Sequence, residues 1–218
     1  MFDKTLAVIY NLAPDTKIKY KDEVWWWAIL PENRRQSTTT LGKTIYFPSR
    51  SQEGWIILAH EGVHEVNFIR SPFQFFCDYL FPQWLAIIPL ALSIATFLCG
   101  LWPVGIALII VATIILAPHR SRRRLDLEKQ AFLMTLAIEY WLAGRISEET
   151  IDKISKSLCG ATYYYMVDSL EEAKDETERM AELVWRYKGL VWEIPYEPFS
   201  NHKSKIYKDM YELVTGAE

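Results

Sequence analysis

The main pattern along the chain is a long apolar stretch in its middle. Residues 79–118 contain no charged side chain, while acidic and basic residues are frequent on both sides. About forty helical residues extend roughly 60 Å, or twice the thickness of a hydrocarbon core. A turn-forming segment, 99–105, which holds two glycines and a proline, divides the stretch near its centre. The pattern therefore predicts two short transmembrane helices, at 84–100 and 104–117, that form a hairpin.

The residues that flank this stretch fit a lipid bilayer as partner. Arginines follow it, at Arg120 and 122–124, and the positive-inside rule places them in the cytoplasm together with both ends of the chain. A buried hairpin in a soluble protein is the alternative, but the segment 106–117 has no polar face. Aromatic residues typical of a membrane interface precede the stretch: Phe73, Phe75, Phe76, Tyr79, Phe81 and Trp84.

The remaining sequence predicts a small sheet followed by helices. Short β-branched or aromatic segments at 6–10, 24–30 and 43–47 predict an N-terminal antiparallel sheet. From Ser51 the apolar period becomes helical. Further helices are predicted at 125–143, 148–158, 163–188 and 203–214.

The predicted fold class is α+β, with a small antiparallel sheet and a helical core interrupted by the transmembrane hairpin. We expect three parts: strands and a first long helix at 1–78, the hairpin at 79–118, and a second helical part at 119–218.

The composition of the chain limits the possible functions. The formal net charge of −3 gives no basic excess for binding nucleic acid. Three widely spaced cysteines exclude a disulfide scaffold and fit a reducing compartment. The oligomeric state is left open.

The residues that point to chemistry are His60-Glu61-Gly62-Val63-His64. Positions four apart share a helix face, so both imidazoles can reach one ion. Glu61 lies beside them, where it can accept a proton from a water that the metal activates. This arrangement is the H-E-x-x-H pattern of zinc peptidases, with two neutral nitrogen ligands and a carboxylate that serves as general base.

A catalytic zinc also needs a third protein ligand. Glu128 is favoured, because it begins the helix after the hairpin and Ala131, one turn further, lets that helix approach closely. If Glu128 and His64 bind one ion, an even number of membrane crossings must separate them, and the apolar pattern predicts two. The alternatives are Glu139, three turns on; Glu65, which points about 100° away from His64; and the remaining histidines, His119 and His202.

On these residues the chain resembles the gluzincin metallopeptidases, in which H-E-x-x-H is followed by a helix carrying E-x-x-A. Its layout is closest to the membrane proteases of the HtpX and CaaX prenyl protease type, where a transmembrane hairpin separates the two motifs. The resemblance covers residues 41–143. It departs at Phe132, which follows Ala131 where those families usually have Asp, and in the longer spacing from Ser121-Arg122 to Glu128.

The resemblance implies a zincin-like core with His60, His64 and Glu128 as zinc ligands and Glu61 as general base. It also implies that the strand 43–47 is an edge that pairs with an extended substrate. The function expected is therefore that of a membrane-anchored zinc metalloendopeptidase acting on a peptide or protein.

The alternative is a catalytically inert, membrane-anchored scaffold or assembly module that keeps a peptidase-like site. Phe132 and the compact size favour this alternative. Glu61 opposes it, because a purely structural metal site has no use for a free base.

Overall fold

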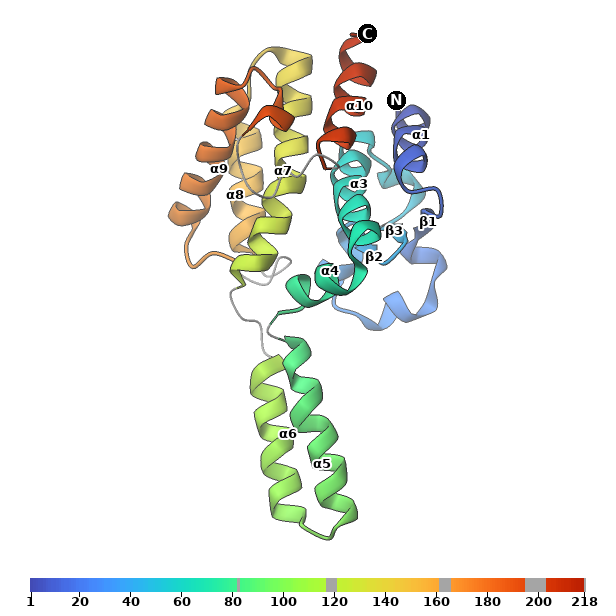
Figure 1. Cartoon of the computed structure of the whole chain (residues 1–218), viewed down its shortest axis with the longest axis vertical. Helices are drawn as coiled ribbons and strands as arrows, with labels where there is room; N and C mark the ends of the chain where they lie inside the picture. The colour runs from blue at the N-terminus through green and yellow to red at the C-terminus, as the bar shows by residue number, and fades with distance from the viewer. Residues whose placement is uncertain (82, 117–120, 161–165, 195–202, 218) are drawn as a thin grey trace.

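The computed structural model is mostly helical, with one small sheet and a hairpin that projects from a globular part (Figure 1). It describes residues 1–81, 83–116, 121–160, 166–194 and 203–217. The α-helices are α1 (Phe2–Leu12), α2 (Glu32–Gln36), α3 (Trp55–Arg70), α4 (Pro72–Tyr79), α5 (Ile87–Leu98), α6 (Trp102–Leu116), α7 (Arg122–Ala143), α8 (Glu148–Cys159), α9 (Leu170–Arg186) and α10 (Lys203–Thr215), and the strands are β1 (Lys17–Tyr20), β2 (Thr39–Leu41) and β3 (Thr44–Phe47).

The sheet is mixed, so the prediction of an antiparallel sheet is correct for only one of its two strand pairs. Strand β3 lies in the centre, parallel to β1 and antiparallel to β2. The predicted strand 43–47 is confirmed by β3. It is not an edge, however, because it is paired on both sides, and β2 forms an edge of the sheet instead.

The other two predicted strands are wrong. Residues 6–10 belong to α1, whose buried Thr5 and Ile9 are four residues apart and therefore share one helix face. Most of the segment 24–30 forms a short 3₁₀ helix, Trp25–Ile29. In it the buried Trp27 stacks on Trp26. In both segments apolar residues occur without the strict alternation of a half-buried strand.

Most predicted helices are confirmed, and their ends follow local capping. Helix α7 ends at Gly144, which adopts a left-handed conformation with φ of 68°. The Ser147 side chain caps α8 by accepting from the Thr150 amide. Helix α9 begins later than predicted, because Ser169 caps it by accepting from the Glu172 amide. The start predicted at 163 lies outside the described residues.

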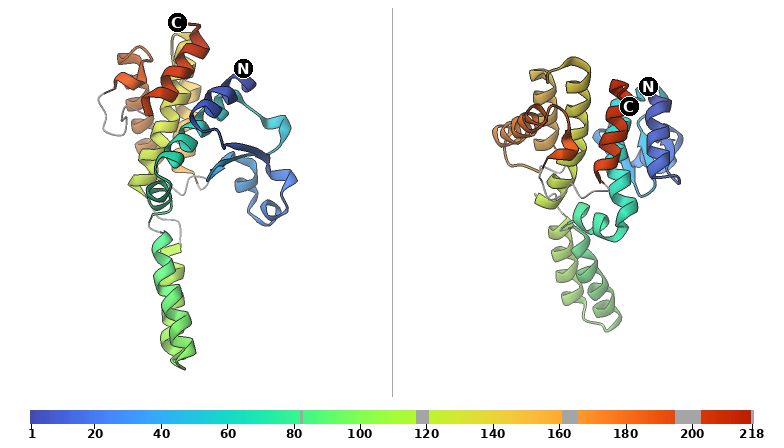
Figure 2. Two further views of the ribbon diagram at one scale, coloured as in Figure 1. Left: turned by 45° about the vertical axis from the view of Figure 1, so that its right-hand side comes forward. Right: turned by 45° about the horizontal axis from the view of Figure 1, so that its top comes forward.

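Helix α3 lies in the centre of the globular part, and α1, α7 and α10 pack around it (Figures 1 and 2). Gly62 of α3 has no space for a side chain, since a Cβ there would lie 2.7 Å from Ile9 Cδ1 of α1. The buried Ala59 and Val63 of α3 belong to the same core cluster as Ala131 of α7. Small residues on α3 thus allow close contact on several faces at once, which fixes its position and rotation.

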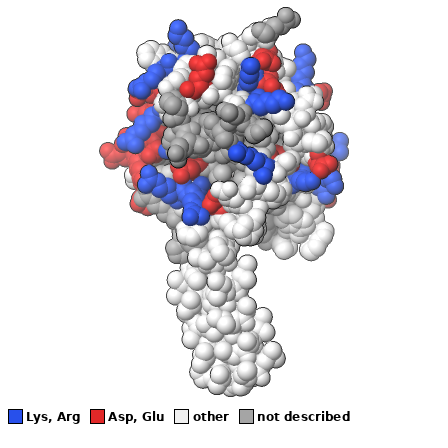
Figure 3. All heavy atoms as spheres, viewed as in Figure 1, with Lys and Arg blue, Asp and Glu red and all other residues white. Residues whose placement is uncertain are grey.

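Helices α5 and α6 pack against each other and form the hairpin, with the turn at Gly100 (φ 74°). Both ends of the hairpin join the globular part (Figure 1), and its visible surface carries no charged side chain (Figure 3). Among the described residues, no single helix has both the length and the apolar content needed to cross a membrane. Helix α4 and residues 83–98 have sufficient length and apolar content only when taken together, and a bend of 88° separates them. Crossing of a membrane thus stays a prediction.

Gly144 provides a test of how α7 ends. Replacement by alanine should lower the free energy of unfolding by about 1 kcal/mol, because a Cβ is strained at positive φ. No other group lies within 4 Å of the added Cβ, so the effect reports the backbone alone. Chemical denaturation in detergent measures the change. Gly144→Asn is the control and should cost less, and equal stability of wild type and Gly144→Ala would contradict the left-handed cap.

Candidate metal centre

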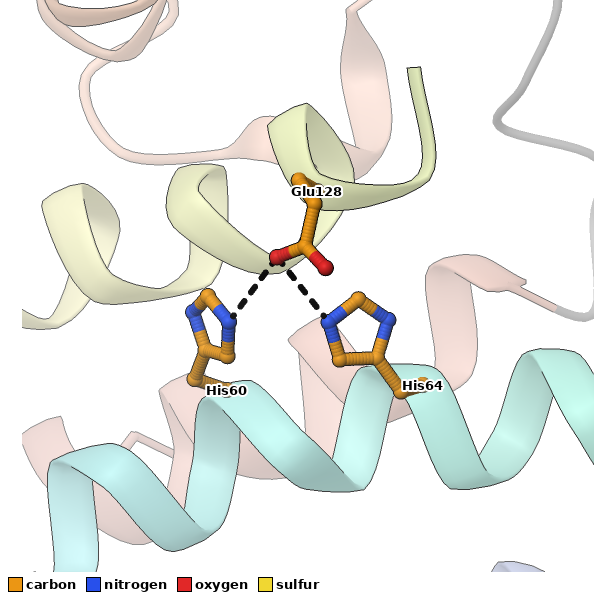
Figure 4. A group of neighbouring side chains, drawn as sticks. All are labelled: His60, His64 and Glu128. Atoms are coloured by element: carbon orange, nitrogen blue, oxygen red, sulfur yellow. Dashed lines mark ion pairs between the residues drawn. The ribbon is translucent and has the colours of Figure 1, made fainter. Parts of the chain in front are cut away.

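Three buried side chains from two helices converge on one point. His60 and His64 project from the same face of α3, and Glu128 of α7 points between them (Figure 4). Glu128 Oε2 lies 3.3 Å from His64 Nε2 and 3.6 Å from His60 Nε2. The structure thus brings together the three residues that the sequence analysis selected as ligands.

The spacing of these three atoms fits a tetrahedral metal ion. Two ligand bonds of about 2.0–2.1 Å at a tetrahedral angle place their donor atoms about 3.3–3.4 Å apart. The two distances to Glu128 Oε2 are close to this value, and one ligand atom from each of the three residues lies within 4.8 Å of the other two. Two imidazoles and one carboxylate are the donor set of many catalytic zinc sites, which keep a fourth position open. The residues present therefore fit zinc.

The electrostatics of the cluster also favour a cation. Burial raises the pKa of Glu128, but the two imidazoles outweigh this effect and hold that pKa well below its usual range. Burial lowers the pKa of His64, yet the Glu128 carboxylate outweighs it and the net shift is upward. A buried carboxylate needs a compensating positive charge. A proton on the imidazoles or a divalent metal ion supplies that charge.

Two side chains of α7, Phe132 and Thr135, contact His60. Phe132 packs its ring against His60, with the centroids 4.7 Å apart. One turn further along α7, Thr135 Oγ1 lies 3.3 Å from His60 Nδ1. A partner on the second ring nitrogen fixes the orientation and tautomer of a metal-binding histidine. Thr135 therefore occupies the position from which His60 can be oriented, although Phe132 itself has no polar group to offer.

Glu61 lies beside the cluster and faces a large groove. The groove has a volume of about 1280 Å³, and His60, Glu61 and Phe132 are among the residues that line it. Thr40 of β2 donates a hydrogen bond of 2.6 Å to Glu61 Oε2. The carboxylate is therefore held by the sheet on one side, while the residue lines the groove on the other.

The other described candidates for the third ligand, Glu65 and Glu139, do not belong to the converging group. Glu65 turns away from the cluster and accepts a hydrogen bond of 3.1 Å from Thr16, and burial raises its pKa to about 7. Glu139 lines the groove and accepts from the Ser147 amide at 3.0 Å. His119 and His202 lie outside the described residues.

Three residues of the site were not identified from the sequence: Thr40, Tyr79 and Thr135. Tyr79 donates a hydrogen bond of 3.1 Å to Glu128 Oε1. In the sequence it is one of several aromatic residues before the hairpin, and nothing local separates it from the others. For Thr135 a signal was present, because it lies seven residues after Glu128 and so on the same face of α7.

The ligand assignment can be tested by zinc content. Wild-type chain purified in detergent should hold about one zinc ion, and Glu128→Ala should hold clearly less, because two imidazoles alone leave the site incomplete. Glu139→Ala is the matched control on the same helix and should keep the wild-type content. Elemental analysis measures all three. A full zinc complement in Glu128→Ala would contradict the assignment.

Comparison with known proteins gives no relative for this chain. No protein family, curated protein or solved structure matches it. What can be inferred about its function therefore comes from its own residues and their geometry.

Proposed function

We propose that this chain is a membrane-anchored zinc metallopeptidase with a gluzincin-like site. The observation that carries the proposal is the convergence of His60, His64 and Glu128 on one point, with Glu61 beside them facing a groove. Ligands alone would fit a structural metal site. A separate carboxylate that is open to a substrate-sized groove is what hydrolysis needs in addition.

Each residue has a distinct role in this proposal. His60, His64 and Glu128 hold the ion. Bound zinc supplies Lewis acidity, polarising the scissile carbonyl and lowering the pKa of water. Glu61 accepts the proton of the attacking water and then delivers it to the leaving amine. The hydrogen bond from Thr40 holds the Glu61 carboxylate in place while its charge changes.

The groove and the edge of the sheet support a peptide as substrate. Residues Gln36, Ser37 and Thr38, which lead directly into β2, line the groove together with His60 and Glu61. Since β2 is an edge strand, an extended peptide can add to it by main-chain hydrogen bonds and lie across the site. This role falls to β2 instead of the strand 43–47, which is fully paired. Apolar side chains from α3, α7 and α8 form the rest of the lining: Trp55, Ile56, Ile57, Phe132, Leu142 and Ile154.

We also propose that the hairpin inserts into a lipid bilayer from the side of the globular part. Its helices expose large apolar side chains such as Ile94, Leu98 and Ile110, and residues 79–118 carry no charge. An apolar surface on all sides is costly in water and suits hydrocarbon. Because both ends of the hairpin join the globular part, the residues before and after it lie on one side, which the positive-inside rule makes the cytoplasm.

The alternative, an inert membrane module that binds metal for structural reasons, is favoured by Phe132. One observation weighs against it. Glu61, which is not a ligand, has its own hydrogen-bond support at the groove. A site that no longer hydrolyses peptides has no need for that support.

The variant Glu61→Gln distinguishes the metallopeptidase from the inert membrane module. The variant should lose hydrolysis by at least about 100-fold, because an amide cannot accept the proton of the attacking water. Zinc content should stay at the wild-type value, since Glu61 is not a ligand. Denatured casein serves as substrate, with release of peptides as the readout. Equal turnover by wild type and Glu61→Gln would remove Glu61 from the mechanism, and zinc-loaded wild type without turnover would favour the inert module.

Removal of the hairpin tests the membrane anchor. A chain in which a short Gly-Ser linker replaces residues 84–117 should move from the membrane fraction to the soluble fraction, because the exposed apolar surface is lost. Fractionation in carbonate buffer measures this shift beside the full-length chain. Zinc content verifies that the remaining parts have folded. A folded variant that stays with the membrane would place the anchor elsewhere.

A further inference from the structure

An arginine in the first turn of α7 is buried at the base of the hairpin. Arg124 is only 1% exposed. Its Nε donates a hydrogen bond of 2.6 Å to the Tyr79 carbonyl, and its Nη2 donates one of 3.0 Å to Gln83 Oε1. A buried guanidinium is tolerated only where acceptors compensate its desolvation. Arg124 therefore adds no exposed charge to the group of arginines that follows the hairpin. It joins α7 to the segment that leads into α5.

Tyr79, whose carbonyl accepts the hydrogen bond from Arg124, also forms a hydrogen bond with Glu128. Tyr79, the last residue of α4, donates its hydroxyl to Glu128 Oε1 at 3.1 Å. Its ring stacks on Phe75, with the planes at 16°, and the Arg124 guanidinium lies 5.5 Å from the ring centroid. The phenol is thus fixed by its backbone, by its ring and by its hydroxyl.

We propose that Tyr79 is a positioning residue for Glu128, and that Arg124 couples this position to the base of the hairpin. The inference rests on the proposed metal site. A carboxylate can bind a metal through one oxygen or through both. The Tyr79 hydroxyl occupies Oε1, which leaves Oε2 to face the two imidazoles. Glu128 would then offer a single ligand atom to the metal, which would leave a fourth position of a tetrahedral ion for water or substrate.

The coupling gives the hairpin an influence on the metal. Arg124 lies one turn before Glu128 on α7, and through Gln83 it also contacts the start of the hairpin. A shift of the hairpin base moves the acceptors of Arg124, and with them the Tyr79 backbone. Metal affinity therefore depends on contacts that lie between the membrane segment and the ligand, although Tyr79 and Arg124 are not ligands themselves.

The test uses the full chain in detergent micelles, with zinc titrated against a competing chelator and cobalt as a spectroscopic probe. Tyr79→Phe keeps the stacked ring and removes only the hydroxyl. It should weaken zinc binding about 10-fold, the lower range for loss of a partner that orients a ligand. The visible absorption of bound cobalt should also lose intensity, because Glu128 is then free to bind through both oxygens and raise the coordination number to five.

Arg124→Lys should also weaken zinc binding. Because both residues act through the position of Tyr79, the double variant should lose less affinity than the sum of the two single losses. Gln83→Leu is the milder variant if Arg124→Lys does not fold. The control is Tyr207→Phe, which removes another buried hydroxyl that donates to α7, at the Gln130 carbonyl. It should leave affinity and spectrum unchanged.

Three results would overturn the inference. Wild-type affinity and an unchanged cobalt spectrum in Tyr79→Phe would remove Tyr79 from the site while leaving the proposed function intact. An equal loss in Tyr207→Phe would show a general packing effect. A wild-type chain that binds no zinc would overturn both this inference and the proposed function.

Discussion

The close packing of α3 against α7 is the contact on which the whole site depends. It brings two imidazoles from one helix to a carboxylate from another, and neither helix has a metal site alone. The small residues of α3 make this approach possible, since Gly62 leaves no room for a side chain beside Ile9 and Ala59 lies in the core that α7 completes. Any change in the rotation of α3 would direct His60 and His64 away from Glu128.

This packing concentrates polar groups where apolar ones would be less costly. His60, Glu61, His64, Arg124 and Glu128 are all buried. Burial of so many ionisable side chains adds little to stability, and partners are needed to offset their desolvation. Three of them have defined polar neighbours: imidazoles and Tyr79 for Glu128, Thr40 for Glu61, and backbone and amide oxygens for Arg124. Such an arrangement is more readily explained by chemistry at the site than by folding.

The parts of the fold that could be predicted from the sequence were those fixed by local patterns. The shared face of His60 and His64, the caps at Gly144 and Ser147 and the helical hairpin all follow from spacing within a few residues. Glu128 was selected from its helix and from a resemblance, and the structure places it at the imidazoles.

Other parts depend on contacts between distant segments and could not be predicted in this way. Residues 6–10 have a composition suited to a strand, but tertiary packing against α3 selects a helix. The parallel pairing of β3 with β1 joins segments that are separated in the chain by two 3₁₀ helices, α2 and β2. Tyr79 reaches Glu128 only because the hairpin returns the chain to its starting point.

The position of the hairpin between the two halves of the site sets an order for biosynthesis. During synthesis His60 and His64 leave the ribosome first, and the complete hairpin must follow before Glu128 appears. In the proposed function, metal binding by all three side chains would therefore come only after the apolar segment has been made. A bound ion would then join the chain on both sides of the hairpin and close that segment into a loop, much as a covalent cross-link would. Loss of the metal would open this loop and free the two halves of the site from each other.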